Sequence, residues 1–230
     1  MLSTSANKPA TGFTILELAI VLLIVSALTA SLLGPFTNYL YQRQVAQTEK
    51  SLEEIKEALL GFAAANGRLP FPAAIGGDGT EDNTTNCSNG YCSGQIPWQT
   101  LGITRMDAWN NFIRYSVGDK FTVTPVKFAS TAATDPDVDT RLPGAAATTR
   151  IATNVPAIVW SVGRRDVQDG VNSDEQENRR LFLHTSATPT IITRQYSETG
   201  TVGGEFDDLV VWVSAPVLFN RMLSGGQSLK

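Results

Sequence analysis

The sequence has few of the residues on which most catalytic and metal sites depend. Its 230 residues include two cysteines and one histidine, and only 17% of them are charged. It contains neither a Walker A sequence nor a G-x-S-x-G serine. The 18 Lys and Arg against 22 Asp and Glu give a net charge of −4, which provides no net attraction for a phosphate backbone. We therefore expect neither an enzyme nor a nucleic-acid-binding protein.

Long apolar runs are also lacking, with one exception, so a polytopic membrane protein is excluded. The exception is Phe13–Leu33, in which Glu17 is the only charged residue. As a helix it would measure roughly 31 Å, the thickness of the hydrocarbon core of a bilayer. The remaining sequence is apolar enough for one globular domain of ordinary size. The sequence therefore predicts one membrane-spanning helix and one globular body.

The apolar run begins with a distinctive pattern. A polar leader with one charged side chain, Lys8, ends at Gly12 and is followed by Phe13, a threonine, two aliphatic residues and Glu17. A carboxylate inside lipid costs at least about 2.5–3.5 kcal/mol unless it has a partner. This pattern resembles the type IV pilin superfamily, whose members carry a short leader ending in Gly, then Phe or Met, and a Glu at the same spacing. The resemblance covers the leader and the helix.

The resemblance implies processing and assembly. A prepilin peptidase would cut between Gly12 and Phe13 and methylate the new Phe13 amine. Removal of the leader, residues 1–12, would leave 218 of the 230 residues. In a filament, the Glu17 carboxylate could then pair with the amine of a neighbouring subunit inside a low-dielectric bundle.

Two other interpretations of the N-terminus stay open. A secretory signal peptide would be cleaved downstream of the apolar stretch, where residues 26–31 (SALTAS) offer small side chains. An ordinary single-pass anchor would span the membrane without any role for Glu17. Both leave the carboxylate at Glu17 unexplained.

The helix is expected to continue beyond the apolar run. We predict a membrane or filament-core segment over residues 13–35, with a kink or local melting at Gly34-Pro35. Over residues 36–66, apolar side chains recur at helical spacing and form one stripe, and Asn66-Gly67 ends the helix. The stripe comprises Val45, Leu52, Ile55, Leu59 and Phe62.

The head, residues 67–230, is expected to be β-rich. Residues 73–95 are predicted to form a surface loop holding Cys87 and Cys92, whose CSNGYC spacing matches no C-x-x-C motif and favours a local disulfide. About five strands should form an antiparallel sheet packed on the long helix, which makes the fold class α+β. The lone His184 is expected in a strand with a structural role. The segments that predict strands are 107–117, 120–128, 156–163, 180–184, 190–196 and 207–214.

The acidic loop after Gly163 is a candidate calcium site, because Ca²⁺ takes six to eight oxygen ligands. The loop resembles the S-x-G-x-D-G calcium loop of the major pseudopilins of type II secretion, but Arg165 stands where that pattern has Asp. The alternative is a solvated loop whose acids are neutralised by neighbouring arginines. The calcium ligands implied by the resemblance are Asp166, Asp169 and Asp174, with Asp207 and Asp208 completing the site.

Together these observations predict a structural subunit of a type IV pilus or a type II secretion pseudopilus, most consistent with a low-abundance member. The expected partners are other pilin subunits, the prepilin peptidase, an inner-membrane assembly platform with its cytoplasmic ATPase, and the membrane before assembly. The head would face the periplasm and then lie on the filament. The competing hypothesis is a membrane-anchored periplasmic binding protein without a role in a filament.

Overall fold

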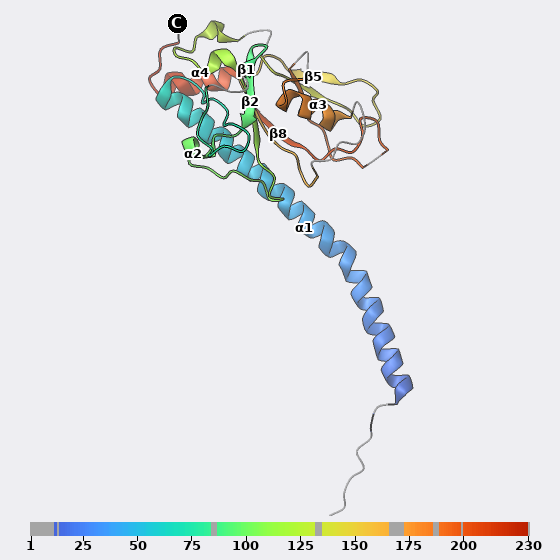
Figure 1. Ribbon diagram of the computed structural model, residues 1–230. Coiled ribbons are helices and arrows are strands. Elements are labelled where there is room, and N and C mark those ends of the chain that lie inside the picture. Colours follow the sequence, from blue (N-terminus) through green and yellow to red (C-terminus); the bar gives the residue numbers. More distant parts are fainter. Residues whose placement is uncertain are drawn as a thin grey trace, which may run out of the picture. The chain divides into compact units, whose positions relative to one another are not determined.

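The computed structural model of the protein describes residues 12, 14–83, 87–131, 135–165, 173–185, 189–198 and 200–229, with side chains except at 32–35. The chain forms two compact units, divided between Arg43 and Gln44. Helix α1 (Ile15–Asn66) contributes its N-terminal part to the first unit and its C-terminal part to the second (Figure 1). We call the second unit, residues 44–230, the globular unit.

Helix α1 is uninterrupted over 52 residues. The local melting expected at Gly34-Pro35 is therefore not seen, because both residues stay within the helix. An internal proline costs a helix about 3 kcal/mol, and the many hydrogen-bonded turns on both sides hold the segment in place. Toward its C-terminal end the helix has the predicted buried stripe, and the side chains of Leu52, Ile55 and Leu59 are 0% exposed.

The main sheet confirms the α+β fold class, with the long helix packed on antiparallel strands. Its five strands lie in the order β1-β2-β3-β6-β8, and each neighbouring pair is antiparallel. The strands are β1 (Cys87–Ser88), β2 (Tyr91–Gln95), β3 (Arg114–Gly118), β6 (Ala157–Ser161) and β8 (Leu209–Val213).

Both faces of this sheet are covered, which makes the globular unit three layers thick. On one face, Ala157 and Val159 of β6 share a core with α1 and α4 (Ala215–Ser224). On the other face, Ile158 and Trp160 share a core with α3 (Asp174–Phe182) and a smaller sheet. Because side chains alternate along a strand, β6 is buried on both sides and has an apolar sequence with few polar positions. Figure 1 shows α4 beside the C-terminal part of α1.

The smaller sheet has the order β5-β4-β7 and was not expected. Its strand β4 (Asp137–Thr140) is antiparallel to β5 (Thr149–Ala152) and parallel to β7 (Thr190–Ile192). Three short helical turns complete the described elements: α2 (Trp98–Leu101), η1 (Asp119–Phe121) and η2 (Phe128–Ser130).

Two predicted strands are wrong. Residues 180–184 belong to the end of helix α3 and the turn after it, because Ser173 caps that helix by accepting a hydrogen bond from the Gln176 N–H at 3.2 Å. The S-x-x-Q spacing is a capping signature that the sequence carries. Residues 120–128 form turns around η1 and η2, since Pro125 in their middle cannot donate a ladder hydrogen bond.

Other elements besides the smaller sheet were also not predicted. The predicted surface loop 73–95 contains strand β2, whose five residues are all buried in the main sheet. At Gly94 a Cβ would lie 2.5 Å from the carbonyl oxygen of Ala73, so only glycine fits this close approach. The C-terminal helix α4 begins after Ser214 with a proline in its first turn and ends at Gly225, which are ordinary helix start and stop signals.

Candidate functional site

Helix α1 begins at the residues of the predicted processing motif. Thr14 immediately precedes the first helical residue, and its Oγ1 accepts a hydrogen bond from the Glu17 backbone N–H at 3.2 Å. The Thr14 carbonyl oxygen accepts from the Leu18 N–H at 3.1 Å. Thr-x-x-Glu is a capping-box sequence, and the helix N-terminus carries a partial positive charge that favours a carboxylate. Glu17 therefore lies in the first turn, where it has a local role as well.

The rest of the motif is described only in part. Phe13 and the leader up to Thr11 lie outside the described residues, whereas Gly12 is described and exposed. Among the described residues, no atom outside Gly12 and its two chain neighbours lies within 4 Å of a Cβ placed on Gly12.

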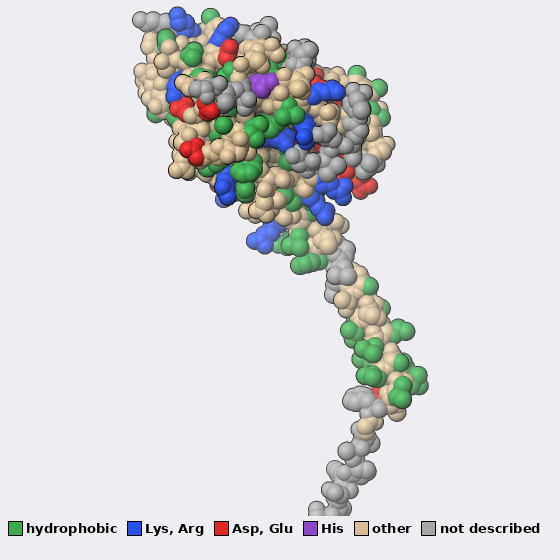
Figure 2. Space-filling view, in the orientation of Figure 1, with side chains coloured by type: hydrophobic (Ala, Val, Ile, Leu, Met, Phe, Trp, Pro, Cys, Tyr) green, Lys and Arg blue, Asp and Glu red, His purple; other side chains and the backbone are tan. Residues whose placement is uncertain are grey.

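The helix surface on both sides of Glu17 in the sequence is apolar and exposed. Ile15, Leu16 and Leu23 are 89%, 71% and 68% exposed, and no residue in the most apolar window of the helix is buried. Figure 2 shows hydrophobic side chains along this part of α1. By length and composition this helix can cross a membrane, and no other helix in the described ranges can. Apolar area of this kind is stabilised by lipid or by other helices, at about 25 cal/mol per Å² removed from water.

A second group of candidate residues lies in the globular unit, where three carboxyl groups meet. Oxygen atoms of Glu175, Asp207 and Asp208 lie within 4.8 Å of one another. Helix α3 supplies Glu175, and the segment leading into β8 supplies both aspartates. Glu175 Oε1 accepts a hydrogen bond from the Asp207 N–H at 3.0 Å, and Asp208 Oδ2 accepts from the Asn178 side chain at 2.7 Å.

Burial raises the pKa of two carboxyl groups in this cluster. Desolvation, followed by the neighbouring charge of Asp208, raises the pKa of Glu175 from 4.5 to about 9. Desolvation also raises the pKa of Asp207, to about 6, although hydrogen bonds from the Arg164 and Arg165 N–H groups oppose the shift. Three ionised carboxylates this close would repel one another strongly. At neutral pH the cluster therefore keeps a proton unless a cation replaces it.

The turn before the acidic loop lies against this cluster. Asp207 Oδ2 accepts from the Arg164 N–H at 2.9 Å and from the Arg165 N–H at 3.2 Å. Gly163 has φ +64°, and a Cβ there would lie 2.3 Å from the Asp207 carbonyl oxygen. The Ser161 hydroxyl has a different partner from this turn's backbone N–H groups, because it donates a hydrogen bond to Asp107 Oδ2 at 2.5 Å. The structure thus brings the Ser-x-Gly turn and Asp207 together.

The predicted calcium ligands do not form one group. Asp166 and Asp169 lie outside the described residues. Asp174 is absent from the acidic cluster, and both of its carboxylate oxygens pair with arginines instead. Glu175, which the resemblance does not include, joins Asp207 and Asp208. Its position follows from the register of helix α3, whereas the sequence predicts a loop at this position.

The cluster fits a divalent cation in charge and in donor type. Carboxylate oxygens are the ligands that Ca²⁺ prefers, and Asp207 Oδ1 is buried without a hydrogen-bond partner among the described residues. Glu175, Asp207 and Asp208 would hold the ion, which would replace the shared proton. Several contacts favour the alternative of neutralisation by arginines. Arg141 and Arg194 pair with Asp174, Arg180 lies 2.9 Å from the Glu177 carboxylate, and Arg165 lies 3.2 Å from the Glu205 carboxylate.

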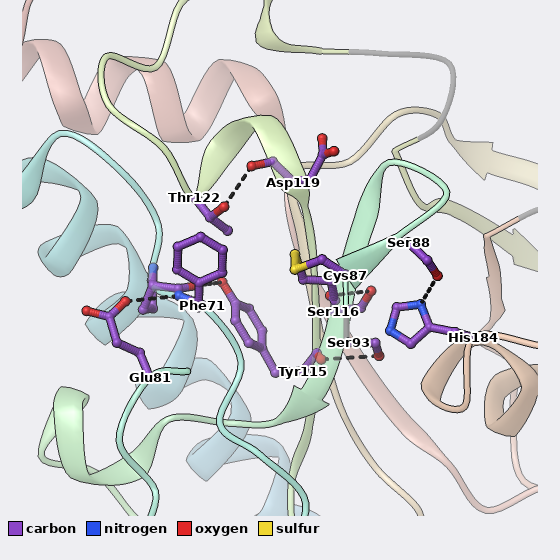
Figure 3. The surroundings of a disulfide bond; sticks show 12 residues. Phe71, Glu81, Cys87, Ser88, Ser93, Tyr115, Ser116, Asp119, Thr122 and His184 are labelled. Atoms are coloured by element: carbon purple, nitrogen blue, oxygen red, sulfur yellow. Dashed lines mark hydrogen bonds between the residues drawn. A yellow bond between two sulfur atoms is a disulfide. The ribbon is translucent and has the colours of Figure 1, made fainter. Parts of the chain in front are cut away.

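The two cysteines form a disulfide in the β1–β2 hairpin, as predicted. Cys87 and Cys92 are paired across the hairpin and bonded. Figure 3 shows His184 near this hairpin, where Ser88 Oγ lies 3.3 Å from its Nδ1. The His184 ring stacks on Tyr91 with centroids 4.6 Å apart. His184 therefore follows helix α3 instead of lying in a strand, and its described contacts are structural.

Comparison with known proteins finds no matching family model, curated protein or solved structure. A long apolar N-terminal helix, an antiparallel sheet and a disulfide are compatible with a pilin-like fold.

Proposed function

We propose that the protein is a structural subunit of a type IV pilus or of a type II secretion pseudopilus. The observation that carries this proposal is Glu17. It is the only charged residue of the apolar segment 13–33, whose described side chains are exposed, and it follows the Gly12-Phe13 pair by one helical turn. An exposed apolar helix requires lipid or neighbouring helices, and a carboxylate within it requires a positive partner.

The chemistry of the proposed assembly follows from these requirements. Cleavage after Gly12 by a prepilin peptidase would place a methylated ammonium group at Phe13, at the start of the apolar helix. The Glu17 carboxylate of one subunit would pair with this ammonium group on its neighbour. Removing one partner of a buried ion pair leaves an uncompensated charge, which costs about 3–5 kcal/mol. This pair would therefore set the register between neighbouring helices.

The globular unit has a supporting role in this proposal. Its buried core and sheet give a stable body at the end of the helix that would be delivered to the periplasm and then to the filament. The inner-membrane platform and its ATPase are the partners that would extract the helix from lipid. The competing function, a membrane-anchored periplasmic binding protein, would use the same helix only as an anchor and would not need Glu17.

The test separates the charge of Glu17 from its capping role. Glu17→Gln keeps a side chain that can complete the capping box but removes the charge, whereas Glu17→Ala removes both. We expect both variants to reach the membrane at normal levels and both to be lost from sheared filaments by at least about tenfold. A matched control is Leu16→Ala, which changes the neighbouring position without altering charge.

The outcomes distinguish the two functions. Loss of both Glu17 variants with normal incorporation of Leu16→Ala supports assembly through the ion pair. Normal incorporation of Glu17→Gln together with loss of Glu17→Ala shows that only the helix cap matters, which contradicts the ion pair. Absence of the wild-type chain from filaments favours the anchored binding protein.

A further inference from the structure

The globular unit contains a cavity of about 580 Å³ that the proposed filament role does not use. It lies between the connection from β4 to β5 and the segment that follows β7. Its walls include apolar side chains that remain largely exposed: Leu142 at 62%, Tyr196 at 54% and Val202 at 48%. Cavities of roughly 300–1,000 Å³ with apolar walls and a few polar groups are typical of ligand sites.

Two arginines supply the polar groups of this cavity. Arg141 and Arg194 both line it, and both pair with the same carboxylate, that of Asp174. The shortest nitrogen–oxygen distances are 2.8 Å for Arg141 and 2.7 Å for Arg194. All three side chains are largely buried, with exposures of 13%, 7% and 1% in the order Arg141, Arg194, Asp174.

This group carries one positive charge in excess, because two guanidinium groups face one carboxylate. Within the described part of the chain, Asp174 is the carboxylate that both guanidinium groups contact, and all three side chains are removed from most of the solvent. A buried charge of this kind is stabilised by an anion that enters the cavity.

The arginines also keep unused hydrogen-bond donors. Arg194 Nη1 donates to Ser197 Oγ at 2.5 Å and Nη2 to the Gly204 carbonyl at 2.8 Å. A guanidinium has two N–H groups on each terminal nitrogen, so each nitrogen keeps one N–H without an acceptor among the described residues. Arg141 Nη2 likewise uses one N–H for Asp174 Oδ1 at 2.8 Å. The cavity thus offers a donor set suited to a carboxylate.

We propose that this cavity binds the C-terminal carboxylate of a partner polypeptide whose last side chain is apolar. One negative charge balances the excess charge of the arginine group. In a chain terminus, the carboxylate and the last side chain leave the same Cα, so the carboxylate reaches the arginines while the side chain contacts the apolar walls. At an internal Asp or Glu, the carboxylate belongs to one residue and the apolar side chain to its neighbour. This arrangement fits the cavity less well than a chain terminus does.

The test titrates peptides into the full-length protein in non-ionic detergent at pH 7 and measures binding by calorimetry. The probe is acetyl-Ala-Ala-Phe with a free carboxylate, and the matched control is the same peptide as the amide. We expect the acid to bind with a Kd of about 10–500 µM and the amide at least about tenfold more weakly, because the charge-assisted hydrogen bonds are lost. Failure of the acid to bind at about 1 mM overturns the proposal.

A protein variant provides the second arm. Substituting either arginine would leave Asp174 without a partner and endanger the fold, so the wall residue Val202 is changed instead. Val202→Glu adds a negative charge at the cavity and should weaken acid binding at least about tenfold. Ile75→Glu, at an exposed position that does not line the cavity, should leave binding unchanged. Equal binding by acid and amide, an unaffected Val202→Glu, or equally tight binding of acetyl-Ala-Asp-Phe-amide each overturns the proposal.

Discussion

The two halves of helix α1 contrast more sharply than any other two regions of the molecule. Leu23 in the first half is 68% exposed, whereas Leu59 in the second half is 0% exposed. In the first half, apolar residues surround the helix axis, whereas in the second they form one stripe beside charged residues. A stripe can be covered by the chain's own sheet, but an apolar surface on all sides needs a surrounding that the chain does not supply. The pattern of apolar residues therefore separates the part whose apolar side chains the chain itself covers from the part whose apolar side chains it leaves exposed.

The largest expected effect uses one substitution on both halves. Leu59→Ala should lower the free energy of unfolding of the globular unit by about 2–5 kcal/mol, because it removes buried apolar volume and leaves a cavity. For a domain of this size the loss corresponds to a Tm about 5–15 °C lower. Leu23→Ala should change the Tm by less than about 2 °C, since its side chain makes no contribution to that core. Thermal unfolding in detergent, followed by circular dichroism, measures both.

Similar changes in Tm from the two substitutions would contradict this difference between the two halves of α1. A large loss from Leu23→Ala would mean that the first half contributes to the stability of the globular unit. A negligible loss from Leu59→Ala would mean that the buried stripe is not part of its core.

The disulfide should have a smaller effect, confined to the globular unit. Replacing both Cys87 and Cys92 by alanine should cost about 2 kcal/mol, because the bond closes only a short loop in the unfolded chain. Membrane fractionation should be unchanged, since the first half of α1 is untouched. A reductant should lower the Tm of the wild-type chain and leave that of the double variant unchanged. If the reductant changed the Tm of the wild-type chain and of the double variant equally, the result would contradict the presence of the disulfide.

The last expected effect is a pH dependence of the globular unit. The pKa of Glu175 is about 9 in the folded chain and 4.5 when unperturbed, and that of Asp207 is about 6 instead of 3.8. The folded state therefore holds protons that the unfolded state releases, so stability is full at low pH and is lost as pH rises from about 4 to 9. With divalent cations chelated, the Tm should be at least about 3 °C higher at pH 5 than at pH 8.

Glu175→Gln tests the origin of this dependence, because glutamine resembles the protonated acid. The variant should flatten the Tm profile between pH 6 and pH 8 and be more stable than the wild type at pH 8. The matched control Glu54→Gln removes an exposed carboxylate and should leave the profile unchanged. An unchanged profile in Glu175→Gln would show that the cluster is not its source.

Much of the fold could be predicted because it depends on local patterns. The stripe in α1 and the continuous apolar strand β6 are visible in the sequence, and the CSNGYC spacing indicated the disulfide. Helix α3 carried a capping signature at Ser173 and Gln176, but the apolar residues at its end suggested a strand. Recognising that signature would have corrected the assignment.

Other parts depend on contacts that no local pattern reveals. Strand β2 consists largely of small and polar residues, and it is held in the sheet by its neighbours and by the close approach of Ala73 to Gly94. The acidic cluster joins Glu175 to Asp207 and Asp208 across more than thirty residues of sequence, shown by the hydrogen bond from Asp207 to Glu175. The pairing of Asp174 with two arginines is equally non-local. Such sites become visible only when the elements have been placed.

The central claim, that the chain is processed for assembly at its first helix, is tested most directly by the intact mass of the mature protein. The measurement uses protein purified from cells with an active prepilin peptidase, together with the Gly12→Glu variant. The predicted result is a chain of 218 residues that begins with methylated Phe13, and an unprocessed chain of 230 residues in the variant. A wild-type chain that begins at Met1, or one that has lost the whole apolar helix, would contradict the account.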